Sequence, residues 1–106
     1  MSSDIETEVI TELQHIAGPL VELGLYNSSK EFIKDVTSDF MMHKIQFYKQ
    51  QLQTFEKKYG MSFKALTQKL ETEASIAEED DWMEWEASKN MLKVWKKAAR
   101  ETGLSA

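Results

Sequence analysis

The sequence predicts an all-α protein, and three observations support this prediction. Apolar residues recur every three or four positions along most of the 106 residues, as they do on one face of a helix. The chain contains 4 glycines and 1 proline, and most of these residues lie between the periodic stretches. Serine or acidic residues precede the stretches and glycine follows several of them, which is typical of helix ends. We therefore expect four helices in a single domain, residues 1–106.

The first expected helix covers residues 4–23. Its apolar residues are spaced three or four apart: Ile5, Val9, Leu13, Ile16, Leu20 and Leu23. Because proline lacks an N–H and clashes with the preceding turn, Gly18-Pro19 predicts a kink or a break near Ala17, with a restart at Pro19. The alternation in residues 5–9 also allows a short strand there as an alternative.

The second expected helix, residues 28–59, has 32 residues without glycine or proline. Ser28 and Glu31 form a predicted capping box, in which Glu31 accepts from the N–H of Ser28, and Gly60 closes the helix. Its heptad seam consists of Met41, Ile45, Tyr48, Leu52, Phe55 and Tyr59. The helix would be about 48 Å long, whereas a domain of this size is only about 30 Å across. The seam is therefore predicted to mediate an intertwined or coiled-coil-like homodimer. Alternatively, the first or last helix of the same chain buries it.

Two further helices are expected after Gly60. Ser62 can cap a short helix over 63–72, with Met61 and Leu66 as a hydrophobic staple. Residues 73–79 have weak periodicity and are predicted to be a linker. The last helix is predicted to begin at a cap formed by Asp80 or Asp81 and to end at Gly103. Its apolar stripe consists of Trp85, Leu92, Trp95 and Ala99, flanked by Trp82 and Met91.

The composition indicates the cellular compartment in which the protein acts. The chain contains no cysteine, which excludes disulfides, thiolate metal sites and thiol nucleophiles and fits a reducing compartment. It has no apolar run of 18 residues, and its first residues lack the basic start of a signal peptide. We expect a soluble cytoplasmic protein without a membrane partner.

The net charge of −5 is unevenly distributed. Residues 71–86 contain eight acids and no base, and Trp82 and Trp85 share a helix face there. Acids beside large apolar anchors are typical of a surface that attracts a basic protein. We predict partner binding through Glu79, Asp80, Asp81, Trp82, Glu84 and Trp85. In the alternative interpretation, the acids cap a helix and the tryptophans belong to the core. In the partner-binding interpretation, residues 60–106 bind the partner and residues 1–59 form the helical hairpin that dimerises.

The sequence offers no catalytic or metal-binding constellation. It lacks a nucleophile motif and a phosphate-binding glycine loop. Glu12-x-x-His15 has the spacing used by di-iron bundles, but those sites need two such motifs, and the second histidine follows Asp39-x-x-x-His43 instead. We expect no enzyme activity and no cofactor.

Two stretches resemble prokaryotic antitoxin families. Residues 23–35, LGLYNSSKEFIKD, resemble the turn between the helices of ribbon-helix-helix proteins. Residues 55–63, FEKKYGMSF, and 79–86, EDDWMEWE, are similar to small helical type II antitoxins of the TumA-like kind. The second resemblance implies a protein that binds and neutralises a basic ribonuclease-type toxin encoded beside it.

The first resemblance implies an alternative function, that of a DNA-binding transcriptional regulator. Ribbon-helix-helix proteins read DNA with an N-terminal strand, whose outward positions here would be Glu6 and Glu8. Phosphates repel carboxylates, so the sequence departs from that family at its contact face. Only Ser28, Ser29 and Lys30, at a helix N-terminus, remain as candidate phosphate contacts. A plain structural or adaptor dimer is the other alternative.

Overall fold

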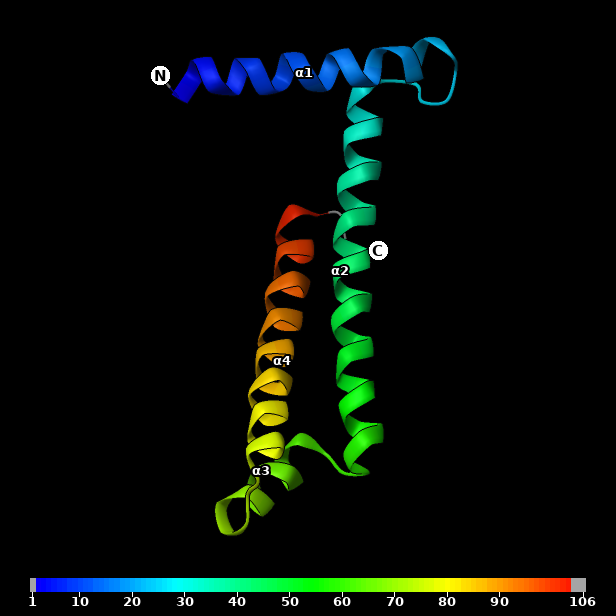
Figure 1. The fold of residues 1–106 in the computed structure, drawn as a ribbon. Helices are drawn as coiled ribbons and strands as arrows, with labels where there is room; N and C mark the ends of the chain where they lie inside the picture. The colour runs from blue at the N-terminus through cyan, green and yellow to red at the C-terminus, as the bar shows by residue number, and fades with distance from the viewer. Residues whose placement is uncertain (1, 104–106) are drawn as a thin grey trace. The chain divides into compact units, whose positions relative to one another are not determined.

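A computed structural model of the chain describes residues 2–103, and these form four helices and no strand (Figure 1). The helices are α1 (Ser2–Glu22), α2 (Ser29–Tyr59), α3 (Phe63–Thr72) and α4 (Ile76–Thr102). The predicted all-α class is confirmed. The chain divides into two compact units, 1–39 and 40–106, and the boundary between them lies within α2. The predicted division at 59/60 between dimerisation and partner binding stays a prediction.

In unit 1, α1 continues through Pro19, and the predicted break near Ala17 is wrong (Figure 1). Helical hydrogen bonding resumes at once, because the N–H of Leu23 donates to the carbonyl of Pro19 at 3.0 Å. The alternative strand over 5–9 is also wrong, since those residues are helical. The smaller change of direction predicted as a kink stays a prediction.

The turn between α1 and α2 follows from glycine and serine chemistry. Gly24 has a positive φ of 79°, its N–H donates to Val21 O at 3.0 Å, and the Leu25 N–H donates to Leu20 O at 2.9 Å. This pair of bonds is a Schellman motif, which ends α1. Ser28 Oγ then accepts from the Glu31 N–H at 3.2 Å, as predicted. The Glu31 carboxylate, however, accepts from the N–H of Asn27 at 3.3 Å, one residue before the predicted donor.

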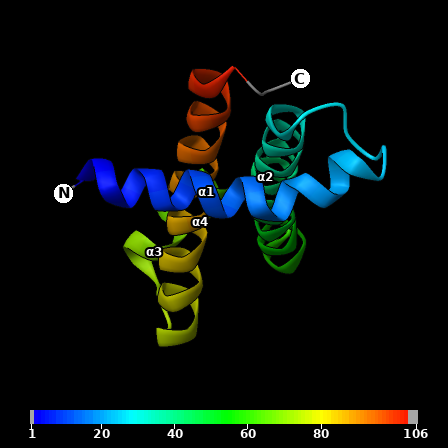
Figure 2. The same cartoon turned by 90° about the horizontal axis from the view of Figure 1, so that it is seen from above.

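In unit 2, α4 runs antiparallel beside the C-terminal part of α2, and α3 lies against α4 (Figures 1 and 2). Two clusters of buried residues hold these helices together. One contains Met41, Ile45 and Ala99, with Leu92 and Trp95 packed on it. The other contains Phe55, Leu66 and Trp85, with Leu52, Tyr59, Met61, Phe63, Leu70 and Trp82 around it.

These clusters account for the heptad seam. Met41, Ile45 and Phe55 are at most 7% exposed within a single chain, and Leu52 and Tyr59 pack on the second cluster. Tyr48 is half-buried and contacts Phe47. Within one chain, five of the six seam residues therefore pack against α3 and α4, which is the alternative in which the same chain buries the seam. The use of the seam as a dimer interface stays a prediction. A heptad pattern requires a neighbouring helix and does not say which chain supplies it.

The short helix α3 and both of its ends are confirmed. Ser62 Oγ accepts from the Ala65 N–H at 3.1 Å, and Leu66 is fully buried. Gly60, with φ 61°, ends α2, and Gly103, with φ 71°, ends α4, as predicted. The predicted linker over 73–79 is wrong beyond Ser75, because α4 begins at Ile76.

The cap of α4 is Ser75 rather than Asp80 or Asp81. Its side chain accepts from the Glu78 N–H at 3.2 Å, and the Glu78 carboxylate accepts from the Ser75 N–H at 3.4 Å. This reciprocal pair is a capping box, which satisfies two backbone donors at once. Asp80 and Asp81 lie within the helix that the box begins.

Candidate functional site

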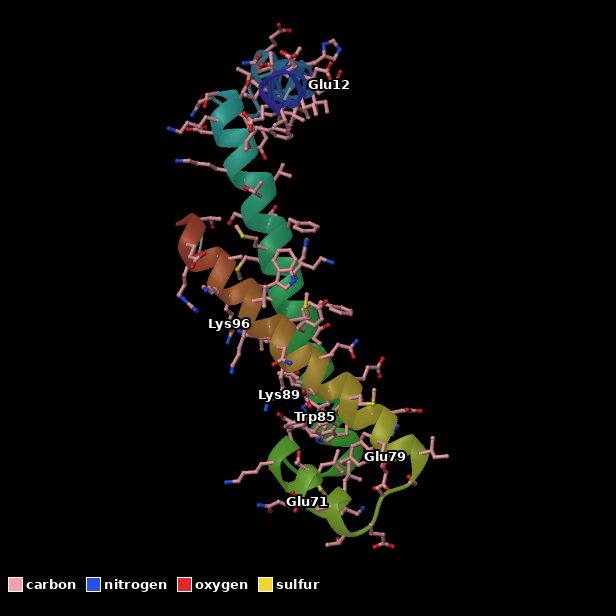
Figure 3. All side chains as sticks on the ribbon, turned by 90° about the vertical axis from the view of Figure 1, so that its left-hand side faces the viewer. Glu12, Glu71, Glu79, Trp85, Lys89 and Lys96 are labelled. Carbon is pink, nitrogen blue, oxygen red and sulfur yellow. The ribbon has the colours of Figure 1, made fainter. Side chains whose placement is uncertain are left out.

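The acidic segment and α3 together form an open groove in unit 2. It has a volume of about 350 Å³ and is lined by Thr67, Leu70, Glu71, Glu79, Trp82 and Met83. Leu70, Trp82 and Met83 form its apolar lining, and Glu71 and Glu79 contribute carboxylates. Figure 3 shows Glu71, Glu79 and Trp85 near the α3 end of this unit.

The structure separates the six predicted partner-binding residues into three groups. Glu79 and Trp82 line the groove. Asp80 and Glu84 are exposed on α4 but do not line it. Asp81 and Trp85 have structural roles, because each is held by residues from other helices.

Trp85 is 1% exposed and therefore cannot act as a surface anchor. Its indole stacks on Phe55 at 5.6 Å between ring centroids and meets Phe63 edge-on at 5.5 Å. The alternative interpretation of a core tryptophan is correct for this residue. Trp85 lies where α2, α3 and α4 meet, and its contacts hold together the helices that form the groove.

Trp82 is half-buried, with one side in the core and one side in the groove. Its indole N–H donates to Thr67 Oγ1 at 2.7 Å, and its ring stacks on Phe63 at 5.5 Å. Lys89 Nζ lies 4.1 Å from the centroid of the same Phe63 ring. These contacts fix the orientation of Trp82, so the groove has a rigid aromatic wall.

Asp81 joins the end of α2 to α4. Its Oδ2 accepts from Lys58 Nζ at 2.6 Å and from the Tyr59 hydroxyl at 2.5 Å. These two donors, Lys58 first, lower the pKa of Asp81. The same contact raises the pKa of Tyr59 to about 12, because a phenolate would lose its hydrogen bond to the carboxylate.

Glu78 is also engaged within the chain. Its Oε2 accepts from Lys69 Nζ at 3.1 Å, and this bond, followed by those from Ser75, lowers the pKa of Glu78. By contrast, Glu71 and Glu79 form no ion pair within residues 2–103, and both are exposed. The groove therefore presents two carboxylates that no lysine of the described chain neutralises.

Sequence reasoning missed Thr67, Leu70, Glu71 and Met83 as groove residues. Leu70 lines the groove and also packs on the second buried cluster. Thr67, Leu70 and Glu71 have the three- and four-residue spacing of one helix face, which is the signal that could have found them. Which face of α4 they would meet depends on tertiary packing.

The predicted phosphate contacts lie in unit 1. Ser29 and Lys30 line a hollow of about 290 Å³, together with Ile10, Leu13, Gln14, Ile33 and Lys34. Ser28 Oγ already accepts the Glu31 N–H, and the nearby Glu31 carboxylate disfavours an anion. Three of the lining residues are aliphatic. Two of the lining residues, Lys30 and Lys34, are basic, and phosphate binding here stays a prediction.

DNA reading by an N-terminal strand also lacks a structural basis. Residues 4–8 are helical, and no strand occurs anywhere in residues 2–103. The described side chains contain no group of three or more metal-ligating residues. No described helix has both the length and the apolarity needed to cross a bilayer.

The groove between α3 and α4 is thus the feature that a partner could recognise. It combines an oriented tryptophan, two aliphatic or thioether side chains and two unpaired carboxylates. Comparisons of the chain with protein-family models, with curated proteins and with solved structures gave no match.

Proposed function

We propose that this protein is a non-enzymatic interaction protein of the cytoplasm that binds a basic protein segment in the α3–α4 groove. The observation that carries the proposal is the pairing of an apolar lining with two carboxylates that have no partner in the described chain. A segment with one apolar side chain beside lysines or arginines would satisfy both features. Burial of the apolar group supplies affinity, and the carboxylates supply orientation.

The charge around the groove extends its reach. Glu73, Asp80 and Glu84 are exposed on the same acidic stretch, residues 71–86. Their field attracts a cationic partner from a distance and raises its rate of association, an effect that salt screens. Partner binding should therefore weaken as ionic strength rises, mainly through slower association.

Within this class, the resemblance of residues 55–63 and 79–86 to TumA-like antitoxins favours one kind of partner. A ribonuclease-type toxin is basic because it binds RNA phosphates. An acidic groove that occupies a basic RNA-binding face would neutralise such a toxin by masking it. We therefore propose an antitoxin role, with the toxin encoded by the adjacent gene.

Co-expression with the product of the adjacent gene tests this role. We expect a complex on size-exclusion chromatography and relief of growth inhibition by the toxin. The groove variant Glu71→Lys/Glu79→Lys should weaken the complex by about tenfold or more, which corresponds to about 1.4 kcal/mol. Met83→Ser should also weaken it, and Met83 is 62% exposed, so the fold should be retained.

The matched control is Asp80→Lys/Glu84→Lys, which changes the net charge equally but lies outside the groove. This control should slow association, because Asp80 and Glu84 contribute to the attracting field, but it should leave the dissociation rate nearly unchanged, so that it loses less affinity than the groove variant. Equal loss in both double variants would show that diffuse charge, and not the groove, holds the partner. Absence of any complex and of growth relief would rule out the antitoxin role and leave a structural or adaptor protein.

A further inference from the structure

α4 carries a second row of residues at heptad spacing, apart from the face that packs in the core. The row begins at the groove and continues to the last turn of the helix, in alternating steps of four and three residues. This spacing keeps the residues on one side of the helix, and it is the pattern that a second helix alongside requires. We call this row the α4 seam: Glu79, Met83, Glu86, Asn90, Lys93, Lys97 and Arg100.

The α4 seam lies beside the buried face of the helix and not within it. Glu86, Lys93 and Arg100 each follow directly on a residue of the packed face, and one residue turns a helix by about 100°. Glu86 is half-buried, and the rest of the seam is exposed. The described helices of unit 2 therefore leave the seam open while they bury Trp85 and Ala99.

The charge of the α4 seam changes sign along the helix. Residues 71–86 contain eight acids and no base, whereas residues 87–100 contain five bases and no acid. Glu86 and Lys93 are about 10.5 Å apart along the helix axis, which exceeds the Debye length of about 8 Å at physiological ionic strength. Each half of the seam therefore presents its own charge to a partner.

The bases of the seam are not neutralised within the described chain. Lys97 forms an ion pair with Glu101 at 3.8 Å, but both side chains are 69% exposed, so solvent weakens this pair. Lys93 and Arg100 form no ion pair within residues 2–103. The carboxylates of the groove are likewise unpaired. A partner can therefore form new charge-assisted contacts at both ends of the seam.

This order of charges indicates which partner fits. A segment that is basic along its whole length would be attracted at the groove and repelled at Lys93, Lys97 and Arg100. A helix with bases at one end and acids at the other is attracted along the whole seam. Polar groups in such a seam also fix the register of two helices. Contact with Met83 adds apolar burial at the basic end of the partner.

We propose that the partner element bound in the groove is a helix that lies along α4 and carries the opposite order of charges. Its lysines or arginines, with an apolar residue among them, lie at the groove, and its aspartates or glutamates lie against Lys93, Lys97 and Arg100. This inference rests on the proposed function and adds an acidic cluster to the partner. The two clusters are about 14 residues apart in the partner helix, to match the rise from Met83 to Lys97.

Charge reversal in the basic half of the seam gives opposite results for the two kinds of partner. The product of the adjacent gene is titrated against the full-length chain and against Lys93→Glu/Lys97→Glu. We expect the variant to have a dissociation constant about tenfold higher, mainly through faster dissociation. A partner that is basic throughout would bind the variant more tightly. Tighter binding or an unchanged affinity would overturn the proposal.

The matched control is Lys49→Glu/Lys57→Glu, which changes the net charge equally at two exposed residues of α2. This control should not weaken the complex, and equal weakening by both variants would overturn the proposal. Absence of any complex with the unaltered protein would overturn the proposed function and this inference together. A complex that Glu71→Lys/Glu79→Lys weakens and Lys93→Glu/Lys97→Glu does not would overturn this inference alone.

Photo-crosslinking locates the two ends of the partner helix without altering the seam. The chain has no cysteine, so Asp80→Cys and Val94→Cys each accept a benzophenone maleimide at one position beside the seam. The label at residue 80 should capture a basic stretch of the partner, and the label at residue 94 an acidic stretch about 14 residues away. Capture of the same stretch from both positions, or of basic stretches alone, would overturn the proposal.

Light scattering of the protein alone distinguishes a second copy as the occupant, because α4 itself has acids at one end and bases at the other. We expect the unaltered protein and Lys93→Glu/Lys97→Glu to have the same mass. A dimer that this variant dissociates would assign the α4 seam to a second copy and overturn the proposal.

Discussion

Asp81 shows how a residue from an acidic segment can serve structure and not recognition. Its side chain is 18% exposed and accepts from Lys58 and from the Tyr59 hydroxyl. Because Lys58 is 59% exposed, solvent screens this ion pair, and we expect it to contribute less than about 1 kcal/mol. The shorter and less exposed contact from Tyr59 is the more important of the two.

The Tyr59–Asp81 hydrogen bond should make stability depend on pH at alkaline values. The folded protein raises the pKa of Tyr59 to about 12, from 10.0. A raised pKa stabilises the folded state fully below pH 10, and this stabilisation is lost as pH rises to about 12. Tyr59→Phe should therefore lower the free energy of unfolding by about 1 kcal/mol at pH 8, with a much smaller difference near pH 12.

Urea unfolding of both proteins at several pH values, followed by tryptophan fluorescence, measures this difference. Lysines also deprotonate in this range, but they do so in both proteins, so the comparison isolates Tyr59. A difference that stays constant from pH 8 to 12 would contradict the assigned hydrogen bond. At the acid end the sign reverses: the lowered pKa of Asp81 stabilises above about pH 3.8, and this contribution is lost on acidification.

At the scale of the helix, the start of α4 depends on one capping box. Ser75 and Glu78 satisfy each other's backbone N–H groups, and Lys69 of α3 holds the same Glu78 carboxylate. The box therefore begins α4 and also ties it to the other helix of the groove. Its loss should loosen the groove as well as the helix end.

Ser75→Ala should lower the free energy of unfolding by about 1 kcal/mol, within the range of 0.5–2 kcal/mol seen for such caps. Asp80→Ala, at a position where the sequence also allowed a cap, should change it by less than about 0.5 kcal/mol. Thermal unfolding followed by circular dichroism distinguishes the two. A larger effect at Asp80 would show that α4 effectively begins later.

Helix ends were predictable where their chemistry is local. Ser62, Gly60 and Gly103 act within four residues of themselves, so their roles follow from sequence alone. The start of α4 could also have been predicted from nearby residues, since Ser75-x-x-Glu78 has the capping-box pattern. The acids that follow it were instead interpreted as the cap, and the start was predicted at Asp80 or Asp81. Pro19 was misjudged for a different reason: one missing N–H need not end a helix whose next bonds can form.

At the scale of the whole molecule, the sequence was insufficient wherever two distant segments meet. The seam residues were identified correctly as a packing face, yet only the placement of α4 shows that the same chain covers them. For the same reason, only part of the groove was predicted from the sequence. Glu79 and Trp82 were within reach of a local argument, whereas Leu70 and Glu71 join them through the packing of α3 on α4.

The two units should differ in how often they open. Unit 2 has two buried clusters within one chain. Unit 1 buries only Ala17 among its described side chains, so fewer buried contacts hold α1 than hold α3 and α4.

Amide hydrogen exchange read out by mass spectrometry can separate the two units. Peptides from α1 should exchange at least about tenfold faster than peptides from α3 and α4, because a smaller buried surface opposes the opening of α1. Peptides that contain Leu66 or Trp85, which are at most 1% exposed, should be among the slowest to exchange. Equal protection of α1 and α4 would contradict this prediction and would mean that contacts beyond the burial of Ala17 hold α1.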